Sequence, residues 1–438
     1  MTKNYLGLDI GTTSICAAVA DAAGALLFCE TAQNDSGDIV QNPQRIWEIC
    51  INILDRAMAA CPDIAGIGLC GQMHGVLYLD TEGRPVSPLY TWQDESGNNI
   101  ARGAVSTLPD CNVTYAQALS ARTGHAMASG FGCTTLFVHA QTGVIPPAAT
   151  RICTIHDWVA MRLCGLTSPV MHASDAASFG LFDLHALHFD MAAIRAASLP
   201  EALFPSVTAG FDILGAYKGI PVAVAVGDNQ ASFLGAAEDP ARTVLVNVGT
   251  GSQCSLAGAY LPPEQLPPGV ELRPLCGDQY LYVGSALCGG RVFALAKGFF
   301  SRCAEFLGID LPERAVYAAM DALLKENPPP LETRLRVDTR FAGTRRDPSL
   351  RGGLAGLGTD NFTPAHLLWG LVEGIAEELY DFFGVGGTER ELLVGAGNGL
   401  RKNAALRQAL ERRFGMPLAV PPYGEEAARG AAKIAAGL

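Results

Sequence analysis

Two polar turns of similar outline are suited to hold the same kind of ligand. The first follows an apolar run and consists of Asp9, Gly11, Thr12, Thr13 and Ser14. The second lies about half the chain further on, with an amide in place of the acid, and consists of Asn247, Gly249, Thr250, Gly251 and Ser252. Backbone N–H groups and hydroxyls in such turns suit phosphate oxygens, and a carboxylate beside them can hold Mg²⁺. The pair therefore predicts a polyphosphate site, although each turn alone is also typical of an ordinary hairpin.

A second carboxylate suited to chemistry is Asp228. It follows Gly227 at the end of the apolar run 221–226. A carboxylate in this position can accept the proton of a hydroxyl that attacks a phosphate, and it is also a candidate Mg²⁺ ligand beside Asp9. It suits equally well the cap of a helix beginning near Ala231, so the residues alone leave both roles open.

Strands and helices alternate in both halves of the chain. A hairpin of strands 4–10 and 15–20 presents the first turn, and a hairpin within 243–257 presents the second. Asn42 and Pro43 predict a helix start, with Asn as the cap and Pro at the first helical position. Further elements are predicted from periodicity and flanking residues: strands at 64–70, 221–226 and 391–394, and helices from 363, over 402–414 and from about 425.

The repeated opening predicts two related α/β domains that face each other across a cleft. The short segment 238–241 reads Glu-Asp-Pro-Ala and marks the boundary. The domains are then 1–240 and 241–438. Interfaces between domains are common ligand sites, so we expect the ligands to bind there.

The composition narrows the class of partner. The chain has 438 residues, of which 49% are hydrophobic, and its net charge is −12. It can bury large cores, and it lacks the basic surface that nucleic acids and anionic membranes require. No apolar run approaches the roughly 18 residues of a membrane span, and no targeting segment stands out. The 13 cysteines form no C-x-x-C pair, which favours reduced thiols in a cytoplasmic enzyme. A homo-oligomer is compatible with the sequence, which does not indicate the oligomeric state.

Seven segments, in order, resemble the FGGY carbohydrate kinase family, which has an actin-like, ribonuclease H-like architecture of two α/β domains. They are DIGTTS at 9–14, GQMHG at 71–75, TWQD at 91–94, GDNQ at 227–230, NVGTGS at 247–252, FAGTRRDPSLRG at 341–352 and GAGNG at 395–399. The likeness covers essentially the whole chain. Segments 129–136, 154–172 and 175–182 resemble the sedoheptulokinase branch, whereas 341–352 is more similar to xylulokinases.

The resemblance implies a role for each polar segment. It makes Asp228 the catalytic base and Asp9 a ligand of the Mg²⁺ carried by ATP, with both turns on the phosphates. It places a sugar against the following side chains: Gln72, Met73, His74, Trp92, Asp94, His156, Asp157, Asn229 and Gln230. It places adenosine at a third turn, where glycine lets the backbone approach a flat ring, formed by Gly395, Gly397 and Asn398. Ordinary packing and connecting roles stay open for these residues.

The expected function is ATP-dependent phosphorylation of the terminal hydroxyl of a ketose, with sedoheptulose as the leading acceptor. Xylulose, ribulose or another polyol is the alternative within the same class. An actin-like ATPase switch without sugar chemistry does not need Gln72, His74 or Asp228, and a sensor that has lost catalysis does not need both acids. A basic cluster of Arg345, Arg346 and Arg351 is expected to be a solvated loop.

Overall fold

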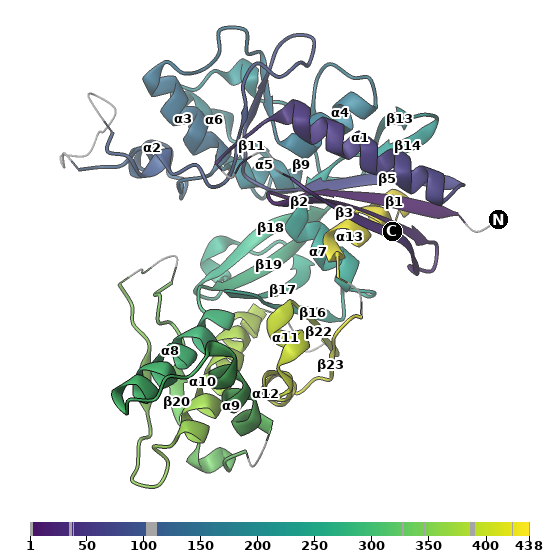
Figure 1. The fold of residues 1–438 in the computed structure, drawn as a ribbon. Helices are drawn as coiled ribbons and strands as arrows, with labels where there is room; N and C mark the ends of the chain where they lie inside the picture. Colours follow the sequence, from purple (N-terminus) through teal and green to yellow (C-terminus); the bar gives the residue numbers. More distant parts are fainter. Residues whose placement is uncertain are drawn as a thin grey trace. The chain divides into compact units, whose positions relative to one another are not determined.

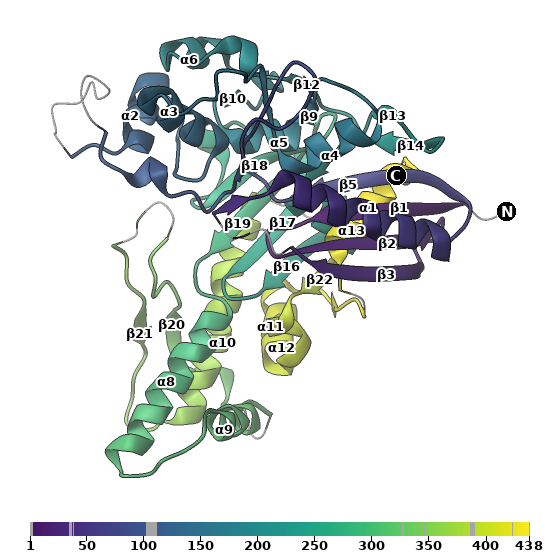
Figure 2. The same cartoon turned by 45° about the horizontal axis from the view of Figure 1, so that its top comes forward.

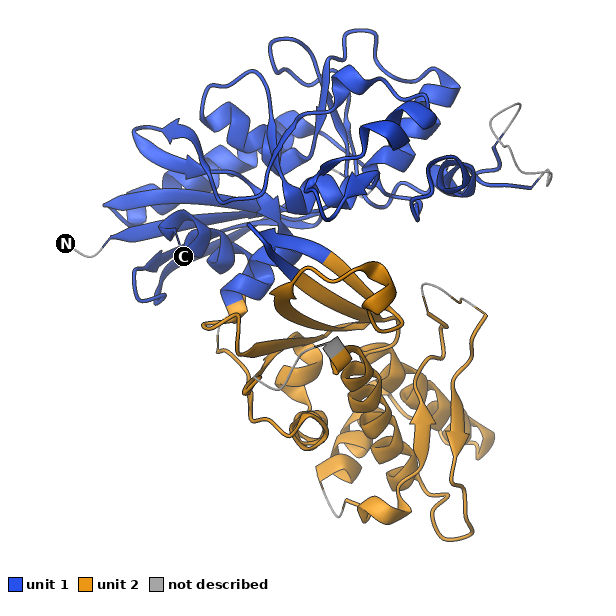
Figure 3. Ribbon diagram, turned by 180° about the vertical axis from the view of Figure 1, so that it is seen from behind, with its two compact units in different colours: residues 1–235, 273–280, 425–438 blue, residues 236–272, 281–424 orange. Residues whose placement is uncertain are grey.

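The computed structural model describes residues 3–34, 37, 39–101, 112–325, 328–344, 347, 349–385, 390–422 and 424–437. The chain divides into two compact units, which Figure 3 colours separately. Unit 1 comprises residues 1–235, 273–280 and 425–438, and unit 2 comprises residues 236–272 and 281–424. The assignment of sugar binding to 1–240 and nucleotide binding to 241–438 stays a prediction. Among the described residues, no helix is both long enough and apolar enough to cross a membrane.

A mixed seven-stranded sheet forms the centre of unit 1. Its strands are β1 (Asn4–Ile10), β2 (Ser14–Asp21), β3 (Leu26–Gln33), β5 (Ile64–Gly71), β13 (Ile213–Tyr217), β14 (Ile220–Ala223) and β15 (Val226–Gly227). Their order is β13-β14-β5-β1-β2-β3, and β15 also pairs with β5. β1 is antiparallel to β2 and parallel to β5. The first predicted hairpin and the strand predicted at 64–70 are therefore confirmed.

The strand predicted at 221–226 is wrong as one continuous element. β14 and β15 both run parallel to β5, but they are separate short strands. Between them the N–H of Val224 donates to the carbonyl of Asp212, with an N···O distance of 2.7 Å. The run from Val222 to Val226 is buried throughout, so its apolar character gave no sign of this break.

Two helices cover opposite faces of this sheet, as Figure 1 shows. α1 (Pro43–Ala60) begins where predicted, because the Asn42 side chain accepts the N–H groups of Gln44 and Arg45 at 3.0 and 3.2 Å. Its apolar stripe packs into the same core as the apolar residues of β1, β2 and β5. On the other face lies α13 (Glu426–Ala436), the predicted final helix, which contacts β1, β5 and β2.

Glycines let α13 approach its neighbours at backbone contact. A Cβ atom at Gly7 of β1 would lie 1.8 Å from the carbonyl oxygen of Ala428, and one at Gly68 of β5 would lie 1.9 Å from that of Ala431. A Cβ at Gly430 would lie 1.8 Å from the carbonyl oxygen of Ala231. Ala231 belongs to α7 (Asp228–Ala236). The end of the chain therefore supports the helix that begins at Asp228.

A second core in unit 1 contains Tyr78, Phe137 and Phe179 and lies beside the sheet. Its helices are α2 (Tyr115–Thr123), α3 (Gly132–Thr142), α4 (Ile155–Leu163), α5 (Ala173–Phe179) and α6 (Met191–Ala196). Short strand pairs join them: β4 (Val40–Gln41) with β7 (Leu89–Tyr90), β6 (Leu77–Leu79) with β8 (Arg151–Cys153), β9 (Val170–His172) with β12 (Ser206–Thr208), and β10 (Phe182–Asp183) with β11 (His188–Phe189). α4 contacts β5 and α5 contacts β15.

A six-stranded sheet forms the centre of the second half. Its strands are β16 (Thr243–Val248), β17 (Ser252–Ala259), β18 (Val270–Cys276), β19 (Gln279–Ala286), β22 (Leu392–Ala396) and β23 (Leu418–Ala419), in the order β18-β19-β17-β16-β22-β23. β16 is antiparallel to β17 and parallel to β22. This arrangement confirms the second predicted hairpin and the strand predicted at 391–394.

In unit 2, the helices α8, α9 and α12 and the strand β20 contact α10 (Pro364–Asp381), and Figure 2 shows α8, α9 and β20 near it. The other elements are α8 (Gly290–Phe306), α9 (Glu313–Lys325), α11 (Asn398–Lys402), α12 (Ala404–Phe414) and the hairpin of β20 (Arg336–Asp338) and β21 (Gly353–Ala355). On one side of α10, Leu371, Ile375 and Leu379 are buried, and Leu367 is partly exposed.

Candidate active site

The ends of three strands bring the predicted acids of unit 1 to one edge of its sheet. Asp9 lies next to the end of β1, and Gly71 ends β5. Gly71 pairs with Gly227, the last residue of β15. Gln72 and Asp228 follow these two glycines directly. In open α/β sheets, the carboxyl ends of the parallel strands are the usual place for ligands.

Asp9 has the electrostatic surroundings of a cation ligand. Burial raises the pKa of its carboxyl to about 7, the carboxylates of Asp228 and Glu425 add to the rise, and the Cys70 thiol opposes it. The Cys70 Sγ lies 3.5 Å from the Asp9 Oδ1. Because two further carboxylates disfavour the charged form, a divalent cation would relieve the repulsion. These residues fit the Mg²⁺ of a nucleotide.

Asp228 is the first residue of α7 and is only partly exposed. Burial raises the pKa of its carboxyl, and the His156 imidazole, the N–H of Asn229 and the Arg273 guanidinium oppose that rise. The start of a helix favours a negative charge. The helix thus begins at Asp228 itself and not near Ala231, so Asp228 is its first residue rather than the cap of a later helix. Its carboxyl also belongs to the group of acids at the strand ends.

A hydrogen-bonded chain of side chains joins the first turn to two predicted sugar contacts. The Trp92 Nε1–H donates to the Thr12 Oγ1 at 3.0 Å, and the Thr12 hydroxyl donates to the Gln72 Oε1 at 3.1 Å. The Gln72 Nε2 donates to the Gln41 Oε1 at 2.8 Å, and the Gln41 Nε2 donates to the Thr12 carbonyl at 2.9 Å. Thr12 is thus engaged within unit 1, whereas Thr13 is exposed and Ser14 starts β2.

His74 is held in an uncommon backbone conformation. Its φ angle is 73°, a region that few residues other than glycine adopt. Its Nδ1 lies 2.7 Å from the Ser178 carbonyl, and its ring stacks on Phe131 with centroids 4.9 Å apart. Met73 beside it is buried and contacts the position where a Gly227 Cβ would be. The fold therefore fixes the His74 ring in place, as a binding residue requires.

Asp94 and Trp92 differ in their accessibility. The Asp94 carboxylate accepts the N–H and the hydroxyl of Ser96 at 2.9 and 3.0 Å and the Thr135 hydroxyl at 3.1 Å. With three bonds to the protein, it retains about one of its four acceptor positions. The Trp92 side chain is 48% exposed, although it is hydrogen-bonded at its nitrogen. Trp92 is therefore the more accessible of the two to a ligand.

His156 and Asp157 lie in the first turn of α4 and are buried, with 0% and 1% exposure. The Asp157 Oδ2 accepts the hydroxyl and the N–H of Thr154 at 2.6 and 3.2 Å, which caps the helix. The His156 Nε2 lies 3.0 Å from the Oδ1 of the equally buried Asp175. Neither predicted side chain is within reach of solvent, so the structure does not bring them into direct contact with a ligand.

Asn229 and Gln230 follow Asp228 on α7. The Asn229 Oδ1 accepts from the Arg273 guanidinium at 3.2 Å. Gln230 is fully buried, and its Nε2 donates to the Pro274 carbonyl at 3.0 Å. Its Oε1 is a buried acceptor with no hydrogen-bond partner among the described residues. Asn229 is partly exposed and is the more accessible of the pair.

Sequence reasoning missed the helix that holds these segments together. The Ser174 Oγ of α5 accepts the N–H of Gly227 at 3.1 Å, and the Ser178 Oγ accepts the N–H of His74 at 3.0 Å. The same helix carries Asp175. These contacts span 53 and 104 residues of sequence, so only the likeness of 175–182 to a kinase branch marked the helix. Gln41 was missed because nothing nearby in the sequence indicates its bonds to the first turn.

In unit 2 the second and third predicted turns lie side by side. β16 and β22 are parallel, with Asn247 opposite Ala396. A Cβ atom at Gly397 would lie 2.5 Å from the Asn247 Oδ1, and Gly397 has a φ angle of 84°. Only glycine fits both the conformation and the close approach. The structure thus brings the predicted adenosine turn to the edge that carries the predicted phosphate turn.

The residues of these turns differ in exposure. Gly249, Thr250 and Asn398 are exposed, Gly251 is partly exposed, and Gly395 is buried within β22. Ser252 is buried, and its Oγ has no hydrogen-bond partner among the described residues. The N–H groups of Gly289 and Arg291, at the start of α8, donate to the Thr250 carbonyl at 3.0 and 3.1 Å, so the turn is braced by this helix.

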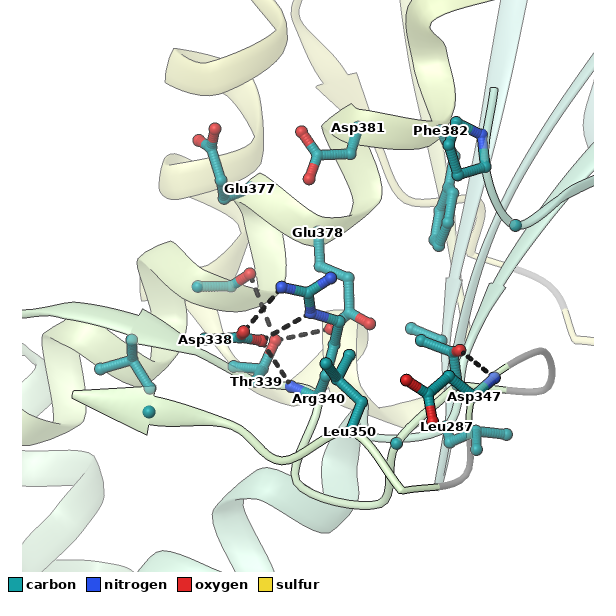
Figure 4. A pocket seen from close by; sticks show the side chains of 18 of the residues that line it. Leu287, Asp338, Thr339, Arg340, Asp347, Leu350, Glu377, Glu378, Asp381 and Phe382 are labelled. Atoms are coloured by element: carbon teal, nitrogen blue, oxygen red, sulfur yellow. Dashed lines mark hydrogen bonds and ion pairs between the residues drawn. The ribbon is translucent and has the colours of Figure 1, made fainter. Parts of the chain in front are cut away.

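A separate cavity of about 1050 Å³ lies in unit 2 and is drawn in Figure 4. Asp338 and Arg340 form an ion pair on its wall, and the Thr339 hydroxyl donates to Glu378 at 2.6 Å. Part of the wall comes from segment 341–352, through Gly343, Thr344, Asp347 and Leu350. Arg345 and Arg346 lie outside the described residues. The predicted nucleotide turns do not contribute to the described part of this wall.

Two family models together match nearly the whole chain. The N-terminal domain of the FGGY family of carbohydrate kinases matches residues 4–245, and its C-terminal domain matches residues 255–437. Both parts of the two-domain family are therefore present in order.

Relatives over the full length agree with this match. A human sedoheptulokinase is 27% identical over 98% of this chain and 96% of its own. A xylulose kinase from Streptomyces coelicolor is 26% identical over 99% and 87%. The crystal structure of a xylulose kinase from Rhodospirillum rubrum has a TM-score of 0.80, covering 99% of this chain and 89% of its own at 22% identity. The chain therefore belongs to the FGGY family of carbohydrate kinases.

Proposed function

We propose that this kinase transfers the γ-phosphoryl group of ATP to the terminal hydroxyl of a ketose, with sedoheptulose as the leading acceptor. That it is an ATP- and Mg²⁺-dependent carbohydrate kinase follows from its family. The observation that carries the finer proposal is the grouping of Asp228, Asp9 and Gln72 at one edge of the unit 1 sheet.

Asp228 accepts the proton of the attacking hydroxyl. The carboxyl must be ionised before phosphoryl transfer, and its pKa must be high enough for it to take up the proton of the hydroxyl. Burial raises the pKa of Asp228, and His156 and Arg273 limit the rise, so the carboxyl can serve as a proton acceptor near neutral pH. Its place as the first residue of α7 fixes its backbone beside Gly71 and Gly227.

Asp9 holds the cation, and bound MgATP supplies the phosphoryl group. The raised pKa of Asp9, about 7, means that cation binding displaces a proton near neutral pH. In unit 2, the backbone of Gly249, Thr250 and Gly251 binds phosphate oxygens, and the glycines of 395–397 with Asn398 bind adenosine. Ser252 supports the turn from its buried position.

The accessible polar side chains of unit 1 orient the sugar. Trp92, His74 and Asn229 are exposed or partly exposed at this edge, and Gln72 is linked to Trp92 through Thr12. Asp94 offers its remaining acceptor position. Met73 and Gln230 support this surface from buried positions, whereas His156 and Asp157 are too deeply buried to contact the sugar.

The identity of the sugar that accepts the phosphoryl group is the most specific part of the proposal. The assignment of sedoheptulose is supported by the similarity of this chain to a human sedoheptulokinase along nearly the full length of both. Xylulose is the second candidate, because the relatives and the structural neighbours include xylulose kinases. A few hydroxyl contacts separate such substrates, since an unpaired buried polar group is costly. A cytoplasmic location stays a prediction.

The test measures ADP release with MgATP and a panel of sedoheptulose, xylulose, ribulose, fructose and glycerol. We expect one ketose to give a kcat/KM at least tenfold above the others, and phosphorus NMR of its product to show a terminal phosphate ester. A preference for glycerol, or equal rates with all five acceptors, contradicts the ketose assignment.

A further inference from the structure

Three buried ionisable side chains lie beneath the proposed base and have no role in the proposed chemistry. His156, Asp157 and Asp175 have exposures of 0%, 1% and 0%, and one ligand atom from each lies within 4.8 Å of the others. Burying such groups is costly unless they are paired. The cluster therefore calls for a function, and its three members are not equivalent.

Asp157 is engaged by its own helix. Its Oδ2 accepts both the hydroxyl and the N–H of Thr154, and the Thr154 Oγ1 accepts the N–H of Asp157 in return. This reciprocal pattern satisfies the first turn of α4. Asp157 is thus accounted for as a helix cap, which leaves His156 and Asp175 as a pair.

The pair joins α4 to α5 directly under the strand ends. The His156 Nε2 lies 3.0 Å from the Asp175 Oδ1. The opposite edge of the ring rests on β5, because a Cβ atom at Gly71 would lie 2.7 Å from the His156 Nδ1. Any side chain at that position would displace the imidazole. The ring is therefore clamped between Asp175 and the backbone of Gly71.

The peptide that leads into Asp228 is held by the same elements. Gly71 is paired with Gly227 across the parallel strands. The Ser174 Oγ, next to Asp175, accepts the N–H of Gly227 at 3.1 Å. A shift of α5 or of the His156 ring would thus reach the residue that precedes the base from two sides.

The charges of these groups act on one another as well. Burial is the largest cause of the raised pKa of Asp175, and the charge of Asp228 is the second. In turn, the His156 imidazole is the group that most strongly opposes the rise in the pKa of Asp228. This coupling places the pair within electrostatic reach of the base. It agrees with the contacts through Gly71 and Gly227.

We propose that Asp175 is a positioning residue for phosphoryl transfer: it holds the His156 imidazole against Gly71 and so fixes the base, Asp228, in its reactive orientation. This inference rests on the proposed role of Asp228. Asp175 does not touch the substrates and acts through His156. Small misplacements of a catalytic group lower turnover strongly, so the pair should affect kcat more than substrate binding.

A metal ion is the competing explanation for the cluster. Zn²⁺ usually has four ligands, and Mg²⁺ has six. The described residues offer three ligand atoms, and two of them, the His156 Nε2 and the Asp175 Oδ1, already lie at hydrogen-bond distance. The His156 Nε2 and the Asp175 Oδ1 form a close polar pair rather than a hydrogen bond, and neither atom has a hydrogen-bond partner among the described residues. The shortage of ligand atoms favours this pair over a metal site.

The experiment is a double-mutant cycle in the full-length protein. Asp175→Leu removes the polar partner at similar volume, and His156→Phe keeps a ring on Gly71 but removes both nitrogens. Asp157→Asn is the matched control, because it changes an equally buried acid of the same cluster and keeps a capping side chain. Steady-state kinetics with MgATP and the best ketose are measured for all four variants, and the metal content of the purified wild type and of Asp175→Leu is measured by mass spectrometry.

We expect each single change to lower kcat at least tenfold while the KM values of sugar and ATP change less than threefold. The double variant should be no slower than the slower single variant, because the two residues act as a unit. Asp157→Asn should keep kcat within threefold. If Asp175→Leu yields no folded protein, the kcat of His156→Phe decides alone.

Four results overturn the inference. They are an unchanged kcat in His156→Phe or Asp175→Leu, an effect confined to KM, losses that multiply in the double variant, and a stoichiometric metal ion that Asp175→Leu removes. Failure of the proposed function is seen separately, as a wild type without sugar-dependent ADP release or an Asp228→Asn variant with a normal rate.

Discussion

The contact between α7 and α13 allows a substitution far from the substrates to test how the base is supported. Gly430 of α13 faces Ala231 of α7, and a Cβ atom there would lie 1.8 Å from the Ala231 carbonyl oxygen and 2.9 Å from the Gly235 nitrogen. Both neighbours are backbone atoms, which cannot rotate away. Gly430→Ala therefore has to separate the two helices.

The size of the effect follows from these distances. Ordinary contact requires at least 3.4 Å, so the helices must move apart by about 1.6 Å, which loosens packing on both sides. Overpacking of this kind costs about 1–3 kcal/mol, and about 3–4 kcal/mol where both neighbours are backbone that cannot yield, while alanine in a helix regains about 1 kcal/mol over glycine. We expect a net loss of about 2–3 kcal/mol in the free energy of unfolding. For a unit of this size that lowers Tm by about 4–12 °C.

The assay combines thermal unfolding with turnover. Because α7 begins at Asp228, the displacement should also lower kcat about tenfold or more at a temperature where the variant is folded. Gly298→Ala in α8 is the control, since a Cβ atom at Gly298 meets no atom within 4 Å, and it should leave Tm unchanged or raise it. A Gly430→Ala variant with the Tm and kcat of the wild type would refute the close packing of α13 on α7.

Three further predictions concern unit 1. Asp9→Asn should raise the Mg²⁺ concentration for half-maximal activity at least tenfold without lowering Tm, because the Asp9 carboxyl is desolvated and lies near the like charges of Asp228 and Glu425. A lower Tm with unchanged Mg²⁺ dependence would make Asp9 a turn residue. Burial raises the pKa of Asp157 to about 7, above its unfolded value. The folded state therefore binds more protons than the unfolded state, and the stability of the protein falls as pH rises from about 4 through 7. Asp157→Asn should flatten the decline in Tm between pH 5 and 8, and an unaltered slope would contradict this prediction. Trp92→Phe removes the donor to Thr12 and should raise the sugar KM severalfold with little change in kcat, whereas unchanged sugar kinetics would leave Trp92 as a packing residue.

Local signals in the sequence were sufficient for much of the framework. The two hairpins, the start of α1 at Asn42 and the final helix all appear where turn chemistry, a cap or periodicity placed them. The break between β14 and β15 could not be predicted, because every residue from Val222 to Val226 is buried and apolar.

The candidate site shows the same limit more sharply. The acids at strand ends could be picked out because Asp9 and Asp228 each follow a buried apolar run. The support of His74 and Gly227 by α5 depends on contacts between distant segments, which no local pattern records. For the same reason, the burial of His156 and its pairing with Asp175 became visible only in the fold.

The central claim is that Asp228 is the base of a sugar kinase, and ADP release by Asp228→Asn beside the wild type tests it most directly. Both proteins are assayed at saturating MgATP and ketose, with sugar binding measured by calorimetry. We predict that the variant binds sugar within about threefold of the wild type and loses kcat by several orders of magnitude, because a neutral amide cannot accept the proton. A variant that binds sugar and turns over near the normal rate would contradict the account.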